Sequence, residues 1–218
     1  MMGEYFKEFF GRLSAFRKVE PVDSVQAFGD FLAGRAAYVS QKKLYEYVKQ
    51  RMGLSYPSHF RDADFIASLN IAKWHVYAAC LSDLAIWMGA QIFHAGASPR
   101  EAAGLSTHAF HDSVMNRFDR GEFTGDVDEL IRSFVDRAAL AGWAALGDGE
   151  AAFRLSPKAL VKWAPISDEL KRYDTEIVIN SLRFAWLDIR EQYRKAIDAD
   201  AVLADWRSRE SESVERVP

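Results

Sequence analysis

One stretch of the sequence, residues 65–95, limits what the rest of the chain can fold into. It contains no proline and a single glycine, Gly89. Between Val76 and Ala90 its apolar residues face almost every direction of a helix, and such a helix has to be enclosed by protein or by lipid. The run is short for a bilayer span and carries Asp83 near its middle, where a charge is costly in hydrocarbon. We therefore predict that residues 65–95 form the central helix of a soluble bundle.

Local signals for helix starts recur after this stretch. Ser98, Pro99 and Glu101 fit a helix start in which a serine caps the backbone amides and a glutamate caps the serine in return. Asp126 with Glu129 gives a second pair of the same kind. The sequence therefore predicts helices that begin at these two places.

The whole chain fits one all-α domain. Long helices are expected at 24–52, from 126 to about 145, and at 167–197, and the sequence has no convincing alternating run of a β-strand. We predict an all-α, single-domain helical bundle of about six or seven helices. We assign residues 1–20 to an N-terminal amphipathic helix, 21–207 to the bundle, and 208–218 to a frayed, disordered tail.

Charge and cysteine content exclude several classes of protein. The net charge of -3 argues against a general nucleic-acid binder, which would carry a basic surplus. A single cysteine, Cys80, cannot form an internal disulfide and is typical of a reducing compartment. The first residues lack a secretory pattern because charges interrupt any apolar core. A cytoplasmic protein is the expectation.

The N-terminal helix combines aromatic and basic side chains. Its apolar residues recur at spacings of three and four and form one stripe: Phe6, Phe9, Phe10, Leu13 and Phe16. Basic residues lie around that stripe: Lys7, Arg12 and Arg17. This composition is typical of a helix that docks on an anionic membrane surface or on a protein partner. The alternative is that the helix packs back on its own bundle.

Two groups of residues resemble parts of a hydrolase site. The nearest approach to the G-x-S-x-G motif runs from Gly104 to His108, lacks the second glycine, and lies inside a predicted helix instead of a strand-turn-helix elbow. Cys80 shares its predicted helix with His75 and His94, and neither can touch it along that helix. We interpret Cys80 as a small core residue and identify no catalytic residue.

A third group offers metal-ligating side chains. His108 and His111, with Glu101 and Asp112, lie on one face of a predicted helix. Metal sites in helical bundles use Glu-x-x-His pairs on facing helices, and these residues do not form such pairs. We interpret the group as a solvated face, and we expect no metal and no cofactor.

Five polar residues stand in apolar surroundings and must be hydrogen-bonded or paired if they are buried. They are Asn70, Lys73, Asp83, Asn180 and Arg183. One interpretation is a fixed network between helices in which Asp83 pairs with Arg183 or Lys73. The other is a polar pocket between helices.

Short matches between residues 42 and 143 follow the order and nearly the spacing of a known family. They are Leu44-Tyr45-Glu46, His75, Leu105-Ser106 with Phe110, and Gly125-Asp126. In these residues the sequence resembles the ubiquinol-cytochrome c chaperone family, helical assembly factors of the respiratory chain. Asp64-Phe65 stands where that family has an arginine-phenylalanine pair. The resemblance implies protein binding near the inner membrane, and no catalysis.

Two hypotheses of function follow. The first is a non-catalytic binding or assembly protein with a protein partner, peripheral to the inner membrane where the N-terminal helix docks. The second is a small hydrolase, because the sequence also resembles uncharacterised alphaproteobacterial helical proteins that sometimes carry an esterase label. A hydrolase needs a nucleophile within reach of a base in a concave pocket, whereas a binding protein needs an exposed apolar patch.

Overall fold

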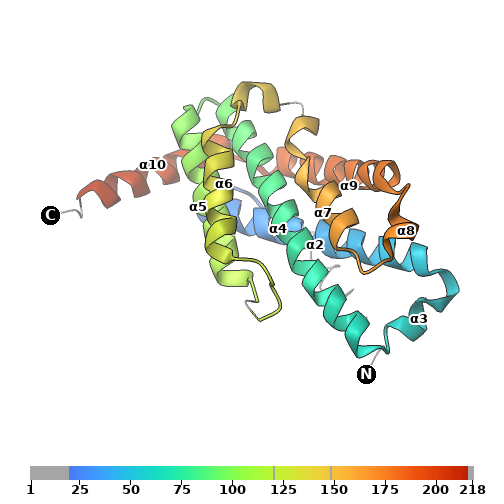
Figure 1. Ribbon diagram of the computed structural model, residues 1–218. Coiled ribbons are helices and arrows are strands. Elements are labelled where there is room, and N and C mark those ends of the chain that lie inside the picture. Colours follow the sequence, from blue (N-terminus) through green and yellow to red (C-terminus); the bar gives the residue numbers. More distant parts are fainter. Residues whose placement is uncertain (1–19, 120, 148, 216–218) are drawn as a thin grey trace.

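The computed structural model describes residues 20–119, 121–147 and 149–215, and over these residues the protein is all-α (Figure 1). The described part forms a single domain of nine α-helices with three short 3-10 turns and no β-strand. The predicted fold class is therefore confirmed. The predicted helix at residues 1–20 lies outside the described residues, apart from its last one.

Helix α4 (Ala63–His94) occupies the centre of the domain. It begins after Asp62, whose side chain accepts the backbone N–H groups of Asp64 and Phe65. Val76, Leu84 and Trp87 are completely buried, as the sequence predicts. Among the described helices α4 is long and apolar enough to cross a membrane, but 83% of its apolar window is buried inside the protein.

The other helices enclose α4 from several sides. Helices α2 (Val25–Met52), α5 (Pro99–Arg117) and α7 (Leu155–Trp163) pack directly against it. Helix α6 (Val127–Ala139) packs on α5, and α9 (Thr175–Ala196) packs on α7 and α2 (Figure 1). Helix α10 (Ala199–Glu215) contacts α2 with its first turns, and its C-terminal part extends beyond the bundle. The short elements are η1 (Gly53–Ser55), α3 (Tyr56–His59), η2 (Trp143–Leu146), η3 (Glu150–Ala152) and α8 (Asp168–Lys171).

The helix starts that were read from local signals are present. Ser98 accepts the backbone N–H of Glu101 at 3.2 Å, and the Glu101 carboxylate accepts the backbone N–H of Ser98 at 2.8 Å. Asp126 likewise accepts the backbone N–H groups at the start of α6. These caps satisfy amides that the first helical turn leaves without partners, so they define where α5 and α6 begin.

Helices α4 and α5 approach closely where α4 carries Gly89. A Cβ atom added at Gly89 would collide with the hydroxyl of Ser106 on α5 and would lie 2.9 Å from the ring of Trp143. The Ser106 hydroxyl donates a hydrogen bond to the backbone carbonyl of Ala85 at 3.2 Å. Glycine at this position therefore lets α5 and η2 pack against the backbone of α4.

Three predicted boundaries differ from the structure. Helix α6 ends at Ala139, and the following residues form the separate turn η2. The predicted helix over 167–197 is broken between α8 and α9. The segment from Ser208, assigned to a frayed tail, is helical as far as Glu215.

A buried carboxylate stabilises the turn between α8 and α9. Asp174 is completely buried and accepts a hydrogen bond from the hydroxyl of Tyr47 at 2.7 Å and another from Nε of Arg51 at 2.6 Å, both on α2. Arg51 also forms an ion pair with it. Burial raises the pKa of Tyr47, which keeps its hydroxyl protonated as a donor. The contact between α2 and Asp174 therefore stabilises the chain where it leaves the helical path.

The start of the described chain meets the link between α9 and α10 at one corner. The backbone N–H of Val22 donates to the carbonyl of Ala196 at 2.9 Å, and the N–H of Asp198 donates to the carbonyl of Val22 at 2.9 Å. The backbone N–H of Val25 donates to the carboxylate of Asp205 at 2.8 Å. The start of α2 is therefore fixed by the link between α9 and α10 and by Asp205 on α10.

Candidate functional site

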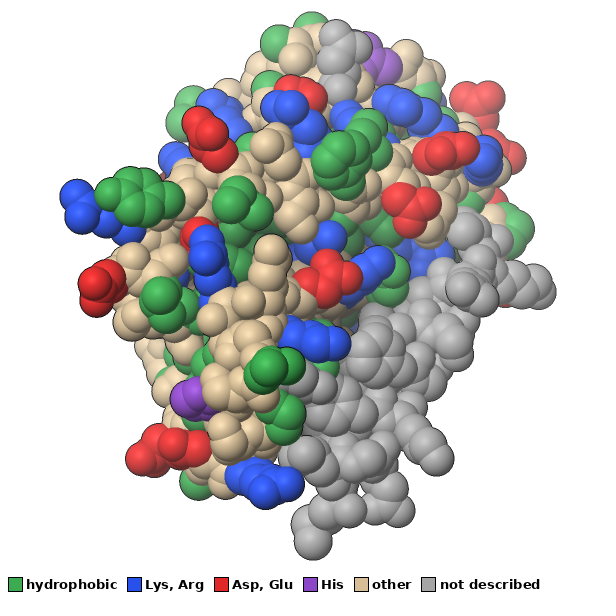
Figure 2. All heavy atoms as spheres, turned by 90° about the vertical axis from the view of Figure 1, so that its right-hand side faces the viewer, with side chains coloured by type: hydrophobic (Ala, Val, Ile, Leu, Met, Phe, Trp, Pro, Cys, Tyr) green, Lys and Arg blue, Asp and Glu red, His purple; other side chains and the backbone are tan. Residues whose placement is uncertain are grey.

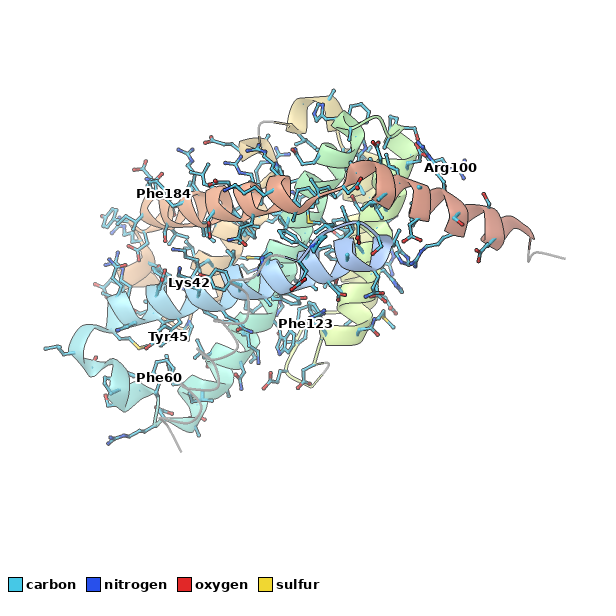
Figure 3. The ribbon with its side chains drawn as sticks, turned by 180° about the vertical axis from the view of Figure 1, so that it is seen from behind. Lys42, Tyr45, Phe60, Arg100, Phe123 and Phe184 are labelled. Atoms are coloured by element: carbon cyan, nitrogen blue, oxygen red, sulfur yellow. The ribbon has the colours of Figure 1, made fainter. Side chains whose placement is uncertain are left out.

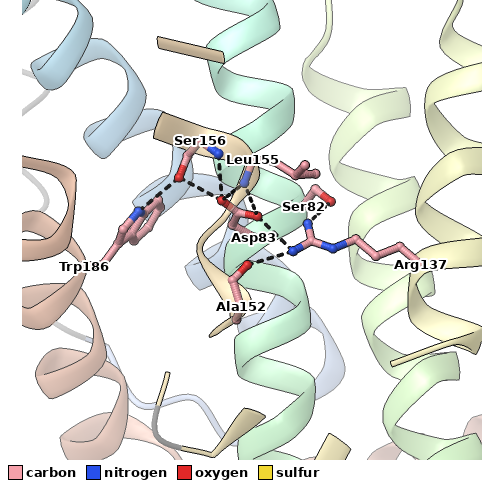
Figure 4. Close-up of polar contacts among 7 residues, drawn as sticks. All are labelled: Ser82, Asp83, Arg137, Ala152, Leu155, Ser156 and Trp186. Carbon is pink, nitrogen blue, oxygen red and sulfur yellow. Dashed lines mark hydrogen bonds and ion pairs between the residues drawn. The ribbon is translucent and has the colours of Figure 1, made fainter. Parts of the chain in front are cut away.

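Asp83, in the middle of α4, is the centre of the most extensive buried polar cluster among the described residues (Figure 4). Its side chain is completely buried. One carboxylate oxygen accepts the backbone N–H of Ser156 at 2.7 Å, the hydroxyl of Ser156 at 2.8 Å and the backbone N–H of Leu155 at 3.0 Å. The other oxygen pairs with Nη2 of Arg137 at 2.9 Å. A carboxylate on α4 thus binds groups from α6 and α7.

The cluster caps α7 from a different helix. Arg154, at the N-cap position of α7, makes no capping bond with its own side chain. The free amides of Leu155 and Ser156 at the start of α7 donate to Asp83 instead. A negative charge at a helix N-terminus is favourable because the backbone N–H groups and the helix dipole both point toward it.

Arg137 and Ser156 extend the cluster to the neighbouring elements. Arg137 donates to the hydroxyl of Ser82 at 2.7 Å and to the backbone carbonyl of Ala152 at 2.7 Å. The hydroxyl of Ser156 accepts the indole N–H of Trp186 on α9 at 3.3 Å. Four helices, α4, α6, α7 and α9, are therefore joined through one set of hydrogen bonds (Figure 4).

The chemistry of this cluster is that of a scaffold. Burial raises the pKa of Asp83, while the guanidinium of Arg137 and the donors of Ser156 and Leu155 act in the opposite direction. The Ser156 hydroxyl is completely buried and bonded on both sides, to Asp83 and to Trp186. A serine nucleophile needs a substrate at its oxygen and a base to take its proton. The hydrogen bonds of the cluster stabilise the packing of α4, α6, α7 and α9.

The predicted network of five polar residues is wrong except for the burial of Asp83. Lys73 pairs with Glu122 at 2.8 Å, and Arg183 pairs with Glu150 at 3.1 Å on the surface. Asn180 is exposed and Asn70 is half-buried. The partner of Asp83 is Arg137 on α6, a residue that no local pattern singles out. Ser156 is followed by a proline, which is typical of a helix start but does not indicate that Asp83 supplies the cap.

Cys80 and the histidines do not come together. Cys80 is completely buried, and burial raises the pKa of its thiol well above the ordinary value. His75 stacks on Trp163 with ring centroids 3.5 Å apart, and its Nε2 lies 2.9 Å from the hydroxyl oxygen of Thr124. Burial and, to a smaller extent, the charge of Lys162 lower the pKa of His75. Cys80 is thus a core residue, and His75 is part of an aromatic contact.

His108 and His111 lie on the exposed face of α5. The ring of His108 lies 5.8 Å from that of Trp206 on α10, and Glu101 is engaged with Ser98 and Arg207. Over residues 20–119, 121–147 and 149–215, no group of three or more His, Cys, Asp or Glu side chains is placed to hold a metal ion.

A shallow hollow of about 520 Å³ lies between the first turns of α4 and the link from α7 to α8. Apolar side chains form much of its lining, including Phe65, Ile71 and Trp163. Ser68 also lines it, but its hydroxyl donates to the backbone carbonyl of Asp64 at 2.9 Å. The hydroxyl of Ser68 is therefore bonded to the backbone of its own helix and not to a base.

The outer face of α9 carries large apolar side chains that the bundle leaves uncovered. Ile177 is 54% exposed, Phe184 is 70% exposed and Leu187 is 46% exposed. Phe184 points away from the bundle (Figure 3). The opposite face is buried against the core through Val178, Leu182, Trp186, Ile189 and Tyr193. Helix α9 thus carries large apolar side chains on its outer face as well as on its core-facing one, and Asn180, Arg183 and Asp188 stand among those on the outside.

Helix α9 begins at the side of the molecule that carries α8 (Figure 1). Figure 2 looks at that side and shows hydrophobic side chains set among charged ones. The charged residues on α9 include Glu176, Arg183 and Glu191. Exposed apolar side chains therefore stand among charged ones along this helix.

The predicted docking residues of the N-terminal helix lie outside the described residues. These are Phe6, Phe9, Phe10, Leu13, Phe16, Lys7, Arg12 and Arg17. No protein-family model matches the chain, and neither the curated proteins nor the solved structures contain a match.

Proposed function

We propose that this protein is a non-catalytic binding protein that receives a helix of a protein partner on the outer face of α9. The observation that carries the proposal is the row of Ile177, Phe184 and Leu187, each about half exposed or more. Fully burying such a side chain is favourable by about 1.5–3 kcal/mol, so a partner that covers these three side chains would gain from the contact.

The spacing of the row supports a helical partner. Phe184 and Leu187 lie three residues apart on one face of α9, and Ile177 lies two turns before Phe184 on the same face, with Asn180 between them. The buried cluster around Asp83 supports a non-catalytic role, because the Ser156 hydroxyl and the Asp83 carboxylate are hydrogen-bonded to each other and to neighbouring helices. The narrower role of a respiratory-chain assembly factor stays a prediction from the resemblance.

A photo-reactive amino acid at position 184 tests the proposal. In cells that make the protein, p-benzoylphenylalanine at Phe184 should give a discrete cross-linked product, because the side chain is covered by a partner. The same group at Leu140, which is 86% exposed but lies outside this row, is the matched control. Equal labelling at both positions, or no product at Phe184, would contradict the proposal.

The alternative, a small hydrolase, is tested by turnover of a short-chain p-nitrophenyl ester. We expect no turnover above the uncatalysed rate. Turnover that a single substitution abolishes would establish the hydrolase, and Ser156→Ala is the first variant to compare. If Ser156→Ala lowers the melting temperature and leaves the rate of ester turnover unchanged, the scaffold role of Ser156 is supported.

A further inference from the structure

We propose that the outer face of α7 binds an extended acidic segment of a protein partner, and that one apolar side chain of this segment enters the hollow beside α7. The surface has two parts. The first is a row of three basic residues, Arg154, Lys158 and Lys162, which we call the α7 basic stripe. The second is the hollow lined by Phe65 and Trp163. This surface is separate from the outer face of α9 and does not depend on the function proposed there.

The α7 basic stripe is a row of cations that the bundle leaves without acidic partners. Arg154, Lys158 and Lys162 recur at every fourth residue, so they lie on one side of the helix, and all three are exposed. Within the described part of the chain none of the three forms an ion pair. The sequence of α7 itself contains no acidic residue. The opposite side of α7 is buried through Ser156, Pro157 and Leu160.

Charge complementarity identifies the chemistry of the partner. The whole chain has a net charge of -3, yet this helix face carries cations alone. A positive patch attracts a negative one across an interface and excludes basic partners. An acidic segment is therefore the ligand that the α7 basic stripe selects.

The hollow gives the α7 basic stripe an apolar neighbour. The Lys162 ammonium lies 5.1 Å from the centre of the Trp163 ring, and Trp163 lines the hollow together with Phe65 and Ile71. A cation thus stands at the rim of an apolar depression. His75 stacks on Trp163 with ring centroids 3.5 Å apart, which fixes the position of the indole.

The shape of the hollow favours a side chain of a larger partner over a free small molecule or a membrane. Sites for small molecules enclose most of the surface of their ligand, and this hollow is shallow. A membrane surface receives side chains that protrude from a protein, whereas Phe65, Ile71 and Trp163 line a depression. One apolar side chain on a protein segment fits a shallow depression.

The spacing of the α7 basic stripe matches an extended chain. Residues four apart in a helix rise by about 6 Å, and every second residue of an extended chain rises by about 6.6 Å. Alternate acidic side chains of the partner can therefore reach successive cations. Asp64, at the first turn of α4, also lines the hollow and repels an acidic chain from that end. The acidic residues therefore lie over α7, and the apolar residue follows them beyond Lys162.

Fluorescence anisotropy with the full chain tests the charged part of the surface. The probe is a fluorescein-labelled peptide in which a phenylalanine follows a run of glutamates. It should bind at about 50 mM salt and bind several-fold more weakly at about 200 mM, because salt screens exposed charges. Lys158→Glu should raise the dissociation constant at least roughly tenfold.

Arg100→Glu is the matched control for Lys158→Glu. Arg100 is an exposed cation at the start of α5 (Figure 3), and its replacement changes the net charge by the same amount. This variant should bind the peptide like the parent. Both substitutions are at exposed positions, so both variants should keep the helical circular dichroism and the melting temperature of the parent.

Filling the hollow tests its part of the surface. Ser68 lines the hollow and is exposed, and its hydroxyl donates to the backbone of its own helix, so Ser68→Trp should keep the melting temperature of the parent. The unmodified protein should bind the phenylalanine peptide several-fold more tightly than the same peptide with alanine. Ser68→Trp should remove this difference and leave the binding of the alanine peptide unchanged.

Several results would overturn the inference. Failure of the unmodified protein to bind the peptide at low salt would do so, and so would equal losses in Lys158→Glu and Arg100→Glu. Equal affinity of the unmodified protein for the two peptides would remove the hollow from the surface. Binding to phosphatidylserine vesicles that Lys158→Glu abolishes, without binding to the peptide, would make a membrane the ligand in place of an acidic segment. The photo-cross-link at position 184 reports on α9, so the proposed function stands or fails separately.

Discussion

The carboxylate of Asp83 accepts the backbone N–H of Ser156 at 2.7 Å across 73 residues of sequence, so the central helix caps the start of α7. The same carboxylate pairs with Arg137. This arrangement makes Asp83 a junction between helices that contact α4 from different sides. Removing the Asp83 carboxylate should therefore weaken the packing of both α6 and α7 against α4.

Asp83→Ala should lower the free energy of unfolding by about 3–5 kcal/mol, because it leaves the half-buried guanidinium of Arg137 without its carboxylate and two helix-start amides without their acceptor. Asp83→Asn keeps an acceptor but loses the charge, so we expect a smaller loss. Urea unfolding followed by circular dichroism measures both. Asp136→Ala, at an exposed position on α6, is the matched control. Equal effects of Asp83→Ala and Asp136→Ala would refute the junction role.

Gly89→Ala should destabilise the protein by about 1–3 kcal/mol, because the new methyl group collides with Ser106 and Trp143. Gly29→Ala is the matched control. Gly29 lies in α2 with no atom within 4 Å of an added Cβ, and alanine there should stabilise by about 0.5–1 kcal/mol. Thermal melts of the two variants should therefore shift in opposite directions. A neutral Gly89→Ala would mean that α5 can move away without cost.

Acid should weaken the contact between α5 and α10. The bond with Arg207 and the donors of Ser98 hold the pKa of Glu101 at about 2, below its ordinary value of 4.5. A carboxylate with a lowered pKa in the folded state adds stability above about pH 4.5, and this part is lost as the pH falls toward 2. The melting temperature of Glu101→Gln should therefore lie below that of the parent at pH 6, and the two should converge near pH 2. A constant difference over this range would contradict the assignment.

Deleting residues 1–18 tests the role of the N-terminal aromatic stripe. If this segment docks on an anionic membrane surface or a partner, the shortened protein should stay folded and helical but should no longer sediment with anionic liposomes or with the partner. The comparison is made with neutral liposomes as the control surface. A large fall in melting temperature would show instead that the phenylalanines are part of the core.

The sequence predicts the features of this fold that depend on neighbouring residues. The central helix follows from an apolar run that must be enclosed, and the start of α5 follows from three residues, Ser98, Pro99 and Glu101, which all act within one helical turn. Such signals are local, so a single sequence is enough to detect them.

The features that the sequence does not predict depend on contacts between distant segments. Asp83 is recognisable as a buried acid, but its partner is set by the packing of α6 and α7 against α4. The break at Asp174 is held by Tyr47 and Arg51, more than 120 residues away. The apolar residues of α9 are too many for one buried face, and only the packing of α9 on α7 and α2 shows that Ile177, Phe184 and Leu187 remain outside.

The corner at Val22 has a consequence for how the chain folds during synthesis. The start of α2 leaves the ribosome early, but the groups that fix it, the carbonyl of Ala196 and the carboxylate of Asp205, are made more than 170 residues later. Domains are synthesised from the N-terminus at about 5–20 residues per second, so this corner stays open for about ten seconds or more. We expect nascent chains that stop before Ala196 to keep the first turn of α2 accessible to proteases, and the closing of the corner to be among the last steps of folding.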